Sequence, residues 1–300
     1  MTELHPLAGV YAASLTPLGA DGALDLDSVP SLLGFLSSRG CHGALIFGTT
    51  GEGPSFSTGE REILWRTAVQ NRPSGFRLLA GTGTPSLTET IHLTRLAFNL
   101  GFEGVVVLPP YYFRKAGEEG LFEWFSELIR QAVPSDGYLL GYHIPGLTGV
   151  GFSLDLLDRL RTAFPGQFAG IKDSSHDEDL ARQLGERFGR DLLVLSGTDS
   201  LLQTALENRA QGCITAPANL ISPDLRLVWE AFRSGKDMGA HQPRVTEQRH
   251  ILEKVSPFPP VLKALIHRLH GFPRWNLRPP LQPLSPGLEE QLVSEMAQLA

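Results

Sequence analysis

Lys172 is the residue of this chain whose type and position most clearly suggest a chemical reaction. It follows a short, mostly apolar run at 168–171 and precedes Asp173. A cation at the end of a buried run loses solvation, and desolvation disfavours the charged form of an amine. A neutral lysine attacks carbonyl carbons and forms Schiff bases. The alternative is a lysine at a strand end whose amine reaches water, since lysine is rarely fully buried.

The turn at Gly48, Thr49 and Thr50 favours the reactive interpretation of Lys172. It follows another apolar run and precedes Ser57, which has capping-box spacing to Glu60. Unpaired N–H groups at a strand-to-helix turn point at an anion, so this turn suits a substrate carboxylate. An ordinary loop rich in turn residues has the same composition.

Two tyrosine positions add a possible proton relay. Tyr142 ends the fifth apolar run, one run before Lys172, where a phenol can transfer protons. A tyrosine at a barrel rim that is hydrogen-bonded to water is the alternative. Tyr111 and Tyr112 follow two prolines after the fourth run, and a pair of exposed tyrosines also suits a protein interface. Together these segments indicate a Schiff-base enzyme acting on a small 2-oxo acid.

The elements that must position these residues recur along the chain. Eight short apolar runs, most without polar alternation, indicate parallel strands buried on both faces. They lie at 9–15, 43–47, 77–80, 104–108, 138–142, 168–171, 192–195 and 212–215. Segments long enough for crossover helices separate them, among them 57–70, 87–100 and 118–132. This alternation predicts an α/β fold, a (β/α)8 TIM barrel, with an open doubly wound sheet as the alternative.

The strand pattern stops after residue 220. Four helical segments are predicted beyond it, at 223–234, 242–255, 260–270 and 288–299. We therefore expect a barrel over 1–222 and a C-terminal helical extension over 223–300.

Composition excludes several classes of partner and compartment. The net charge is −6 and no Lys/Arg block stands out, so we expect no nucleic acid partner. No apolar run approaches the roughly 18 residues of a membrane span, and no secretory signal is visible at the N-terminus. Two cysteines, Cys41 and Cys213, fit a reducing compartment, so the expected location is the cytoplasm. The nine histidines show no zinc-like pairing, so no metal is expected.

These residues, in this order, resemble the pyruvate-dependent class I aldolase family of dihydrodipicolinate synthase and N-acetylneuraminate lyase. The motifs that carry the resemblance are Gly48-Thr49-Thr50-Gly51-Glu52-Gly53, Pro109-Pro110-Tyr111-Tyr112, Tyr142-x-x-Pro145, Gly170-Ile171-Lys172-Asp173 and Gly197-Thr198-Asp199. It runs from about residue 9 to 219, with a weaker echo at 259–263. The resemblance implies a barrel with a helical extension, usually in a homotetramer built as a dimer of dimers.

The resemblance also implies residue roles. Lys172 is similar to the Schiff-base lysine, Tyr142 to the proton-shuttling phenol, and Thr49 to the hydroxyl that links this phenol to a second tyrosine. Tyr112 matches the tyrosine that synthases lend across a dimer interface. Thr50 is similar to a carboxylate ligand, and Ile214 matches a residue whose main chain faces bound pyruvate. Gly48 and Gly197, which lie in the shared motifs, are expected to bind substrate as well. Asp199, Ser174 and His143 are our candidates for contacts with the variable end of the substrate. No metal or organic cofactor is implied, because the lysine forms the covalent intermediate.

The departures from the family pattern concern the substrate. Leu147 stands where the synthases place an arginine for the carboxylate of aspartate semialdehyde, and an aliphatic chain cannot make that contact. Ser200 and His143 also differ from the sialic acid lyases. We therefore expect a lyase or aldolase that interconverts a 2-oxo acid with pyruvate and an aldehyde. A synthase-type condensation, a sugar-acid dehydration with the same lysine, and a non-catalytic binding barrel are the alternatives.

Overall fold

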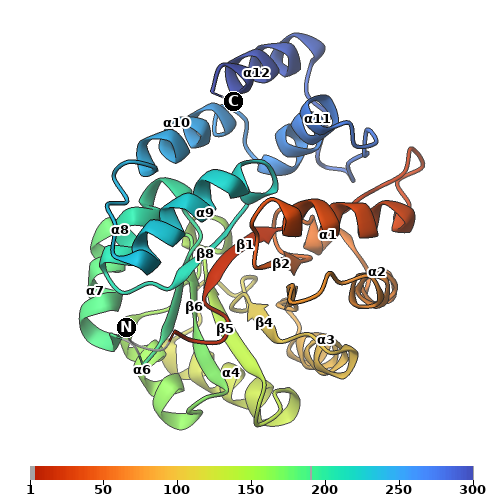
Figure 1. The fold of residues 1–300 in the computed structure, drawn as a ribbon. Coiled ribbons are helices and arrows are strands. Elements are labelled where there is room, and N and C mark those ends of the chain that lie inside the picture. Colours follow the sequence, from red (N-terminus) through yellow and green to blue (C-terminus); the bar gives the residue numbers. More distant parts are fainter. Residues whose placement is uncertain (1–3, 190, 300) are drawn as a thin grey trace. The chain divides into compact units, whose positions relative to one another are not determined.

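The computed structural model describes residues 4–189 and 191–299 of the chain. Its eight strands form a closed barrel in the order β1 to β8, and the strand pairs with a defined register are parallel. The strands are β1 Gly9–Ala13, β2 Gly43–Ile46, β3 Arg77–Gly81, β4 Gly104–Val107, β5 Tyr138–His143, β6 Phe168–Asp173, β7 Leu193–Ser196 and β8 Gly212–Thr215. Along the chain, at least one helix follows each strand (Figure 1), so the predicted (β/α)8 barrel is confirmed.

Burial explains why the strand sequences lack polar alternation. Every residue of β1, β2, β4, β6, β7 and β8 is buried. A parallel strand covered on one face by helices and on the other by the barrel interior needs apolar residues at both parities. Each strand lies within two residues of the predicted run at both ends.

The helices begin where the sequence offers caps. Ser57 and Glu60 form the predicted capping box at the start of α2, and Ser86, Ser153 and Asp177 cap α3, α6 and α7. The helices between strands are α1 Val29–Ser38, α2 Thr58–Gln70, α3 Leu87–Leu100, α4 Glu118–Ala132, α5 Pro145–Thr148, α6 Leu154–Ala163, α7 Glu178–Phe188 and α8 Leu202–Glu207. Three short 3-10 helices are η1 Leu26–Ser28, η2 Gly53–Ser55 and η3 Asp199–Leu201.

The four predicted C-terminal helices are present. They are α9 Ala218–Ser234, α10 Gln242–Leu252, α11 Phe258–His270 and α12 Pro286–Gln298. Helix α9 runs across the predicted division at residue 222, although its backbone is non-helical at Ile221, close to Pro223. Proline lacks an N–H group and disrupts the helix ladder on its N-terminal side. The division into 1–222 and 223–300 stays a prediction.

By their contacts the residues form two compact units that interleave in the sequence. Unit 1 comprises Met1–Gly9 and Arg77–Cys213, and unit 2 comprises Val10–Phe76 and Ile214–Ala300. Lys172 and Tyr142 belong to unit 1, whereas the turn at 48–51 belongs to unit 2. No helix in the described ranges has the length and apolar content required to span a membrane.

Candidate active site

Lys172 and Tyr142 face each other on neighbouring strands of unit 1. Their Cα atoms are register partners between β6 and β5. The Nζ atom of Lys172 lies 4.0 Å from the centroid of the Tyr142 ring. The lysine is only 3% exposed. Within the part of the chain that the structure describes, no carboxylate lies within 4.0 Å of Nζ, so the amine is not held in an ion pair.

The alternation of the strands separates two sets of side chains. Successive residues of a strand point to opposite faces, so Asp173 and His143 face away from Lys172 and Tyr142. The surroundings of β5 agree, because a Cβ on Gly141 would lie 2.7 Å from the Phe152 ring, and the same segment contacts His143. The face that carries Lys172 and Tyr142 is therefore distinct from the helix-facing side of β5 and β6.

His143 is held on the helix-facing side by the backbone. Its Nδ1 accepts a hydrogen bond of 2.9 Å from the N–H of Phe152. Burial lowers the pKa of His143, and the neighbouring Asp173 opposes this shift. Burial likewise raises the pKa of Asp173, whose carboxylate accepts from the N–H of Ser175. The predicted substrate contact of His143 stays a prediction, and the imidazole lies on the opposite face from Lys172.

Ser174 and Gly197 lie together where β6 and β7 end. The N–H of Ser174 donates to the His143 carbonyl at 2.8 Å, and the N–H of Gly197 donates to the Asp173 carbonyl at 2.6 Å. A Cβ on Gly197 would lie 1.8 Å from the Ser174 hydroxyl, so this approach requires glycine. Asp199 follows as the first residue of η3 and is fully buried.

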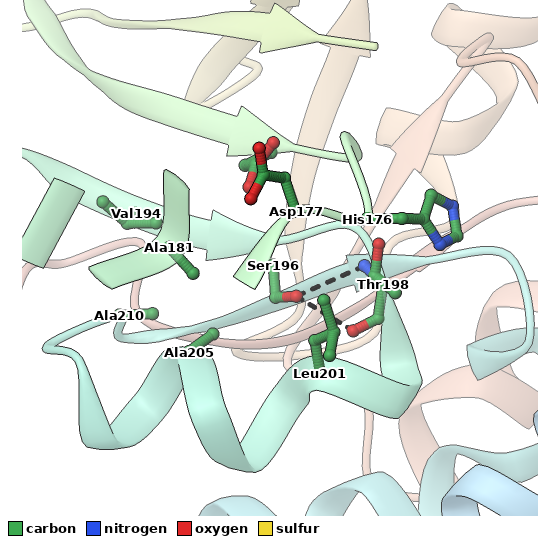
Figure 2. A pocket seen from close by; sticks show the side chains of 10 residues that line it. His176, Asp177, Ala181, Val194, Ser196, Thr198, Leu201, Ala205 and Ala210 are labelled. Atoms are coloured by element: carbon green, nitrogen blue, oxygen red, sulfur yellow. Dashed lines mark hydrogen bonds between the residues drawn. The ribbon is translucent and has the colours of Figure 1, made fainter. Parts of the chain in front are cut away.

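A small cavity lies beside β6 and β7 (Figure 2). It is lined by Asp173 and Ser196, which are register partners, and by Ala181 of α7 and Ala205 of α8. It therefore lies on the helix-facing side of β6 and β7. Its volume of about 10 Å³ holds about one water molecule at most, so it is not a substrate site.

The predicted carboxylate turn lies in unit 2, directly after β2. Gly48 and Thr50 are buried, and Thr49 is half-buried. Ile214, the predicted main-chain contact, is fully buried in β8. These placements match the C-terminal ends of barrel strands, where active sites of this architecture form.

The side chain of Tyr112 lies on the surface of the protein. It is 76% exposed on the loop after β4, and its ring meets that of Phe113 edge-on at 5.3 Å between centroids. A tyrosine this exposed contacts little of its own subunit. Its predicted catalytic role requires another copy of the chain to bring it to a site.

Glu52 and Lys263 are two buried charges outside the predicted site residues. Their side chains form an ion pair of 2.5 Å in unit 2, with exposures of 0% and 2%. Glu52 lies in the motif at 48–53, and Lys263 lies in the segment 259–263, where the family resemblance is weaker. Both residues therefore lie in segments that the sequence had marked. Nothing in the sequence pattern pairs residues that are 211 positions apart.

No group of three or more histidine, cysteine, aspartate or glutamate side chains placed to hold a metal occurs in ranges 4–189 and 191–299. The expectation that the reaction needs no metal or organic cofactor stays a prediction.

Comparison with known proteins identifies the family. The model of the dihydrodipicolinate synthetase family matches residues 6–299. The chain belongs to the dihydrodipicolinate synthetase family. An uncharacterized DapA-like lyase of Chloroflexus aurantiacus is 37% identical to this chain over 278 residues, which cover 92% of each chain. The 4-hydroxy-tetrahydrodipicolinate synthase of Thermus thermophilus is 34% identical over 289 residues and 94% of each chain.

A solved structure of the dihydrodipicolinate synthetase family shares the architecture. YagE of Escherichia coli K12, a prophage protein determined in complex with pyruvate, is 26% identical. It superimposes with a TM-score of 0.92 over 98% of each chain. The expected family is thus confirmed, and the relatives' names include both a lyase and a synthase.

Proposed function

We propose that this protein is a class I lyase or aldolase that converts a small 2-oxo acid to pyruvate and an aldehyde, or catalyses the reverse reaction. The observation that carries the proposal is the buried Lys172 amine against the face of Tyr142. Membership of the family and the pyruvate complex of YagE support it.

The chemistry begins with covalent capture of the substrate. The uncharged amine of Lys172 attacks the C2 ketone, and loss of water gives an iminium ion. This cation accepts the electron pair of the C3–C4 bond as the bond breaks. Tyr142 donates the proton that lets the carbinolamine hydroxyl leave as water. Its phenolate then takes the proton of the C4 hydroxyl, so that an aldehyde leaves and an enamine of pyruvate remains. Protonation at C3 and hydrolysis release pyruvate and the free lysine. In this proposal, no metal or organic cofactor takes part.

The turn after β2 is proposed to bind the substrate carboxylate. Thr50 and the backbone at Gly48 supply hydroxyl and N–H donors, which bind an anion without a buried cation. Thr49 is proposed to link the Tyr142 phenol to Tyr112, and the Ile214 main chain to face bound pyruvate. These roles come from the family resemblance.

The far end of the substrate is proposed to be a short hydroxylated chain rather than a second carboxylate. Leu147 lies on α5, is 63% exposed and offers no charge. Ser174, with Gly197 against it, and Asp199 lie at the ends of β6 and β7 and offer polar groups. We assign the far end to these residues rather than to His143, whose imidazole faces the helices.

We also propose a homo-oligomer, a dimer of dimers, in the cytoplasm. The exposed Tyr112 and Phe113 pair supports a subunit contact at this loop, because large apolar groups gather at interfaces. Sedimentation velocity of the wild type and of a Tyr112→Ala variant tests the assembly.

The experiment that tests the proposed function is borohydride reduction with pyruvate followed by peptide mass spectrometry. A reduced pyruvate adduct at Lys172 is the expected result, and its absence would overturn the proposal. A panel of 2-oxo acids, followed by pyruvate and aldehyde formation, then identifies the substrate. Adduct formation without aldehyde release from any acid would favour a binding barrel.

Condensation with aspartate semialdehyde is the second candidate function. The 34% identity to a 4-hydroxy-tetrahydrodipicolinate synthase favours it. An assay of pyruvate with aspartate semialdehyde separates the two, because rapid turnover would show that Leu147 does not exclude this substrate.

A further inference from the structure

The turn that carries Thr49 and Thr50 is bounded by two strained residues. Phe47 and Glu52 have φ angles of 57° and 55°, in the left-handed region that non-glycine residues disfavour. Both residues are buried. Such conformations persist only where the surroundings determine them, and they concentrate at binding sites. Specific contacts must therefore hold this turn.

The near side of the turn is held by close packing. A Cβ on Gly53 would lie 2.3 Å from the Phe47 carbonyl oxygen, so the two ends of the turn touch. The hydroxyl of Thr16 donates to the Gly51 carbonyl at 2.6 Å. These contacts leave the turn little volume in which to relax. They do not account for the conformation of Glu52.

Glu52 is held by groups from the C-terminal part of unit 2. Lys263 of α11 donates to its Oε1 at 2.5 Å, and the N–H of Arg278 donates to its Oε2 at 3.0 Å. Lys263 also donates to the Asn276 carbonyl at 2.7 Å. Both oxygens of the carboxylate are therefore occupied by donors that leave it one orientation.

Arg278 extends this clamp to the residues that follow the turn. Its guanidinium donates to the Ser55 carbonyl at 2.8 Å and lies 4.2 Å from the centroid of the Phe56 ring. It also pairs with Glu60, the capping residue of α2, at 2.5 Å. Burial lowers the pKa of Lys263, while Glu52 opposes the shift. A buried charge without its partner is strongly destabilising, so Glu52 and Lys263 each require the other to remain in place.

We propose that Glu52 and Lys263 are positioning residues, which fix the strained turn so that Thr49 and Thr50 are ready to bind the substrate carboxylate. This inference rests on the proposed function of that turn. A turn that is already ordered loses no further conformational freedom on binding, which strengthens binding without any contact to the ligand. Neither residue is assigned a contact with substrate.

The test compares two probes of Lys172 in Glu52→Gln and in the double variant Glu52→Gln/Lys263→Met. The first probe is pyruvate and the second is acetone, a ketone without a carboxylate. Each is trapped with borohydride and quantified by mass spectrometry over a concentration series. We expect the half-saturating pyruvate concentration to rise about tenfold. We expect the acetone value and the yield at saturating pyruvate to change little.

The double variant controls for folding. It removes both buried charges, which is tolerated better than leaving one unpaired. The matched control is Lys254→Met/Glu295→Gln, which removes a surface ion pair of 2.6 Å from unit 2 and should leave both probes unchanged.

The outcomes separate the positioning role of Glu52 and Lys263 from the proposed function on which it rests. If wild type traps no pyruvate at Lys172, the proposed function fails first. If wild type traps pyruvate and folded variants keep its half-saturation, only the positioning role is overturned. An equal loss for pyruvate and acetone overturns it too, as does loss of the fold in both variants, because the pair would then serve folding alone.

Discussion

Lys172 and Tyr142 are register partners across β6 and β5, and the lysine Nζ lies 4.0 Å from the centroid of the tyrosine ring. The hydrogen-bond register between the two strands sets this relationship. Side chains alternate between the two faces of a strand, so only residues paired in register point to the same face and come into contact.

Tyr142→Phe should separate proton transfer from covalent capture. The ring remains against Lys172 but the hydroxyl is lost, so kcat should fall by about 10²- to 10⁴-fold. The borohydride-trapped adduct should still form at Lys172, more slowly but to completion. Steady-state kinetics and adduct mass check this. A variant with unchanged kcat would remove Tyr142 from the mechanism.

Gly197→Ala should destabilise the fold where β6 and β7 end. Its Cβ would lie 1.8 Å from the Ser174 hydroxyl and 2.9 Å from the Asp173 carbonyl oxygen. Such overpacking costs about 1–3 kcal/mol. Denaturant titration measures the free energy of unfolding. Gly120→Ala is the control, because Gly120 lies in α4 and a Cβ there would have nothing within 4 Å; equal effects of the two changes would contradict the packing argument.

His5 should make stability dependent on acidity. Burial, with a smaller effect of Arg77, lowers the pKa of His5 from 6.5 to about 4. Its Nδ1 accepts from the N–H of Leu7, which fits a neutral ring. Below pH 6.5 the unfolded chain binds a proton that the folded chain does not bind until about pH 4. Stability should therefore fall as the pH drops through this window.

The measurement for His5 is the melting temperature between pH 6.5 and 4. His5→Phe keeps a ring against Tyr138 and removes the titration, so the slope should become shallower. His92→Gln, at an exposed position of α3, controls for the loss of a histidine as such. An unchanged slope in His5→Phe would refute the assignment.

Leu147→Arg should move specificity toward a substrate with a second carboxylate. The position is exposed, so the fold should accept the longer side chain. A guanidinium that reaches the carboxylate of aspartate semialdehyde should raise kcat/KM for condensation with pyruvate by about tenfold. Leu147→Lys is the control, because its point charge lacks the bidentate geometry. No gain with either variant would place Leu147 outside the substrate's reach.

The barrel was predictable from the sequence because its strands are recognisable by composition. Buried parallel strands need apolar residues on both faces, and all eight runs became strands. The sixth was predicted to end at 171, but β6 continues through Lys172 and Asp173. Polar side chains resemble a loop in sequence, whereas the ladder to β5 continues through the backbone.

The site was predictable only in part. The meeting of Lys172 with Tyr142 followed from two adjacent strands ending in reactive residues. The face of β5 to which the His143 side chain points depends on its position in the strand, and this position is known only once the register is known. The pairing of Glu52 with Lys263 was not predictable, since any carboxylate of the chain is a formal partner for any lysine.

The ladder between β5 and β6 has a consequence for how such a catalyst diversifies. Because two strands carry Lys172 and Tyr142, the proposed reactive amine and phenol, a change in a surrounding loop leaves the register that joins them in place. Leu147 lies on α5, after β5, so its side chain can be exchanged while the proposed catalytic pair stays in place. Under the proposed function, new aldehyde preferences can thus be selected one loop at a time, with the covalent step inherited unchanged.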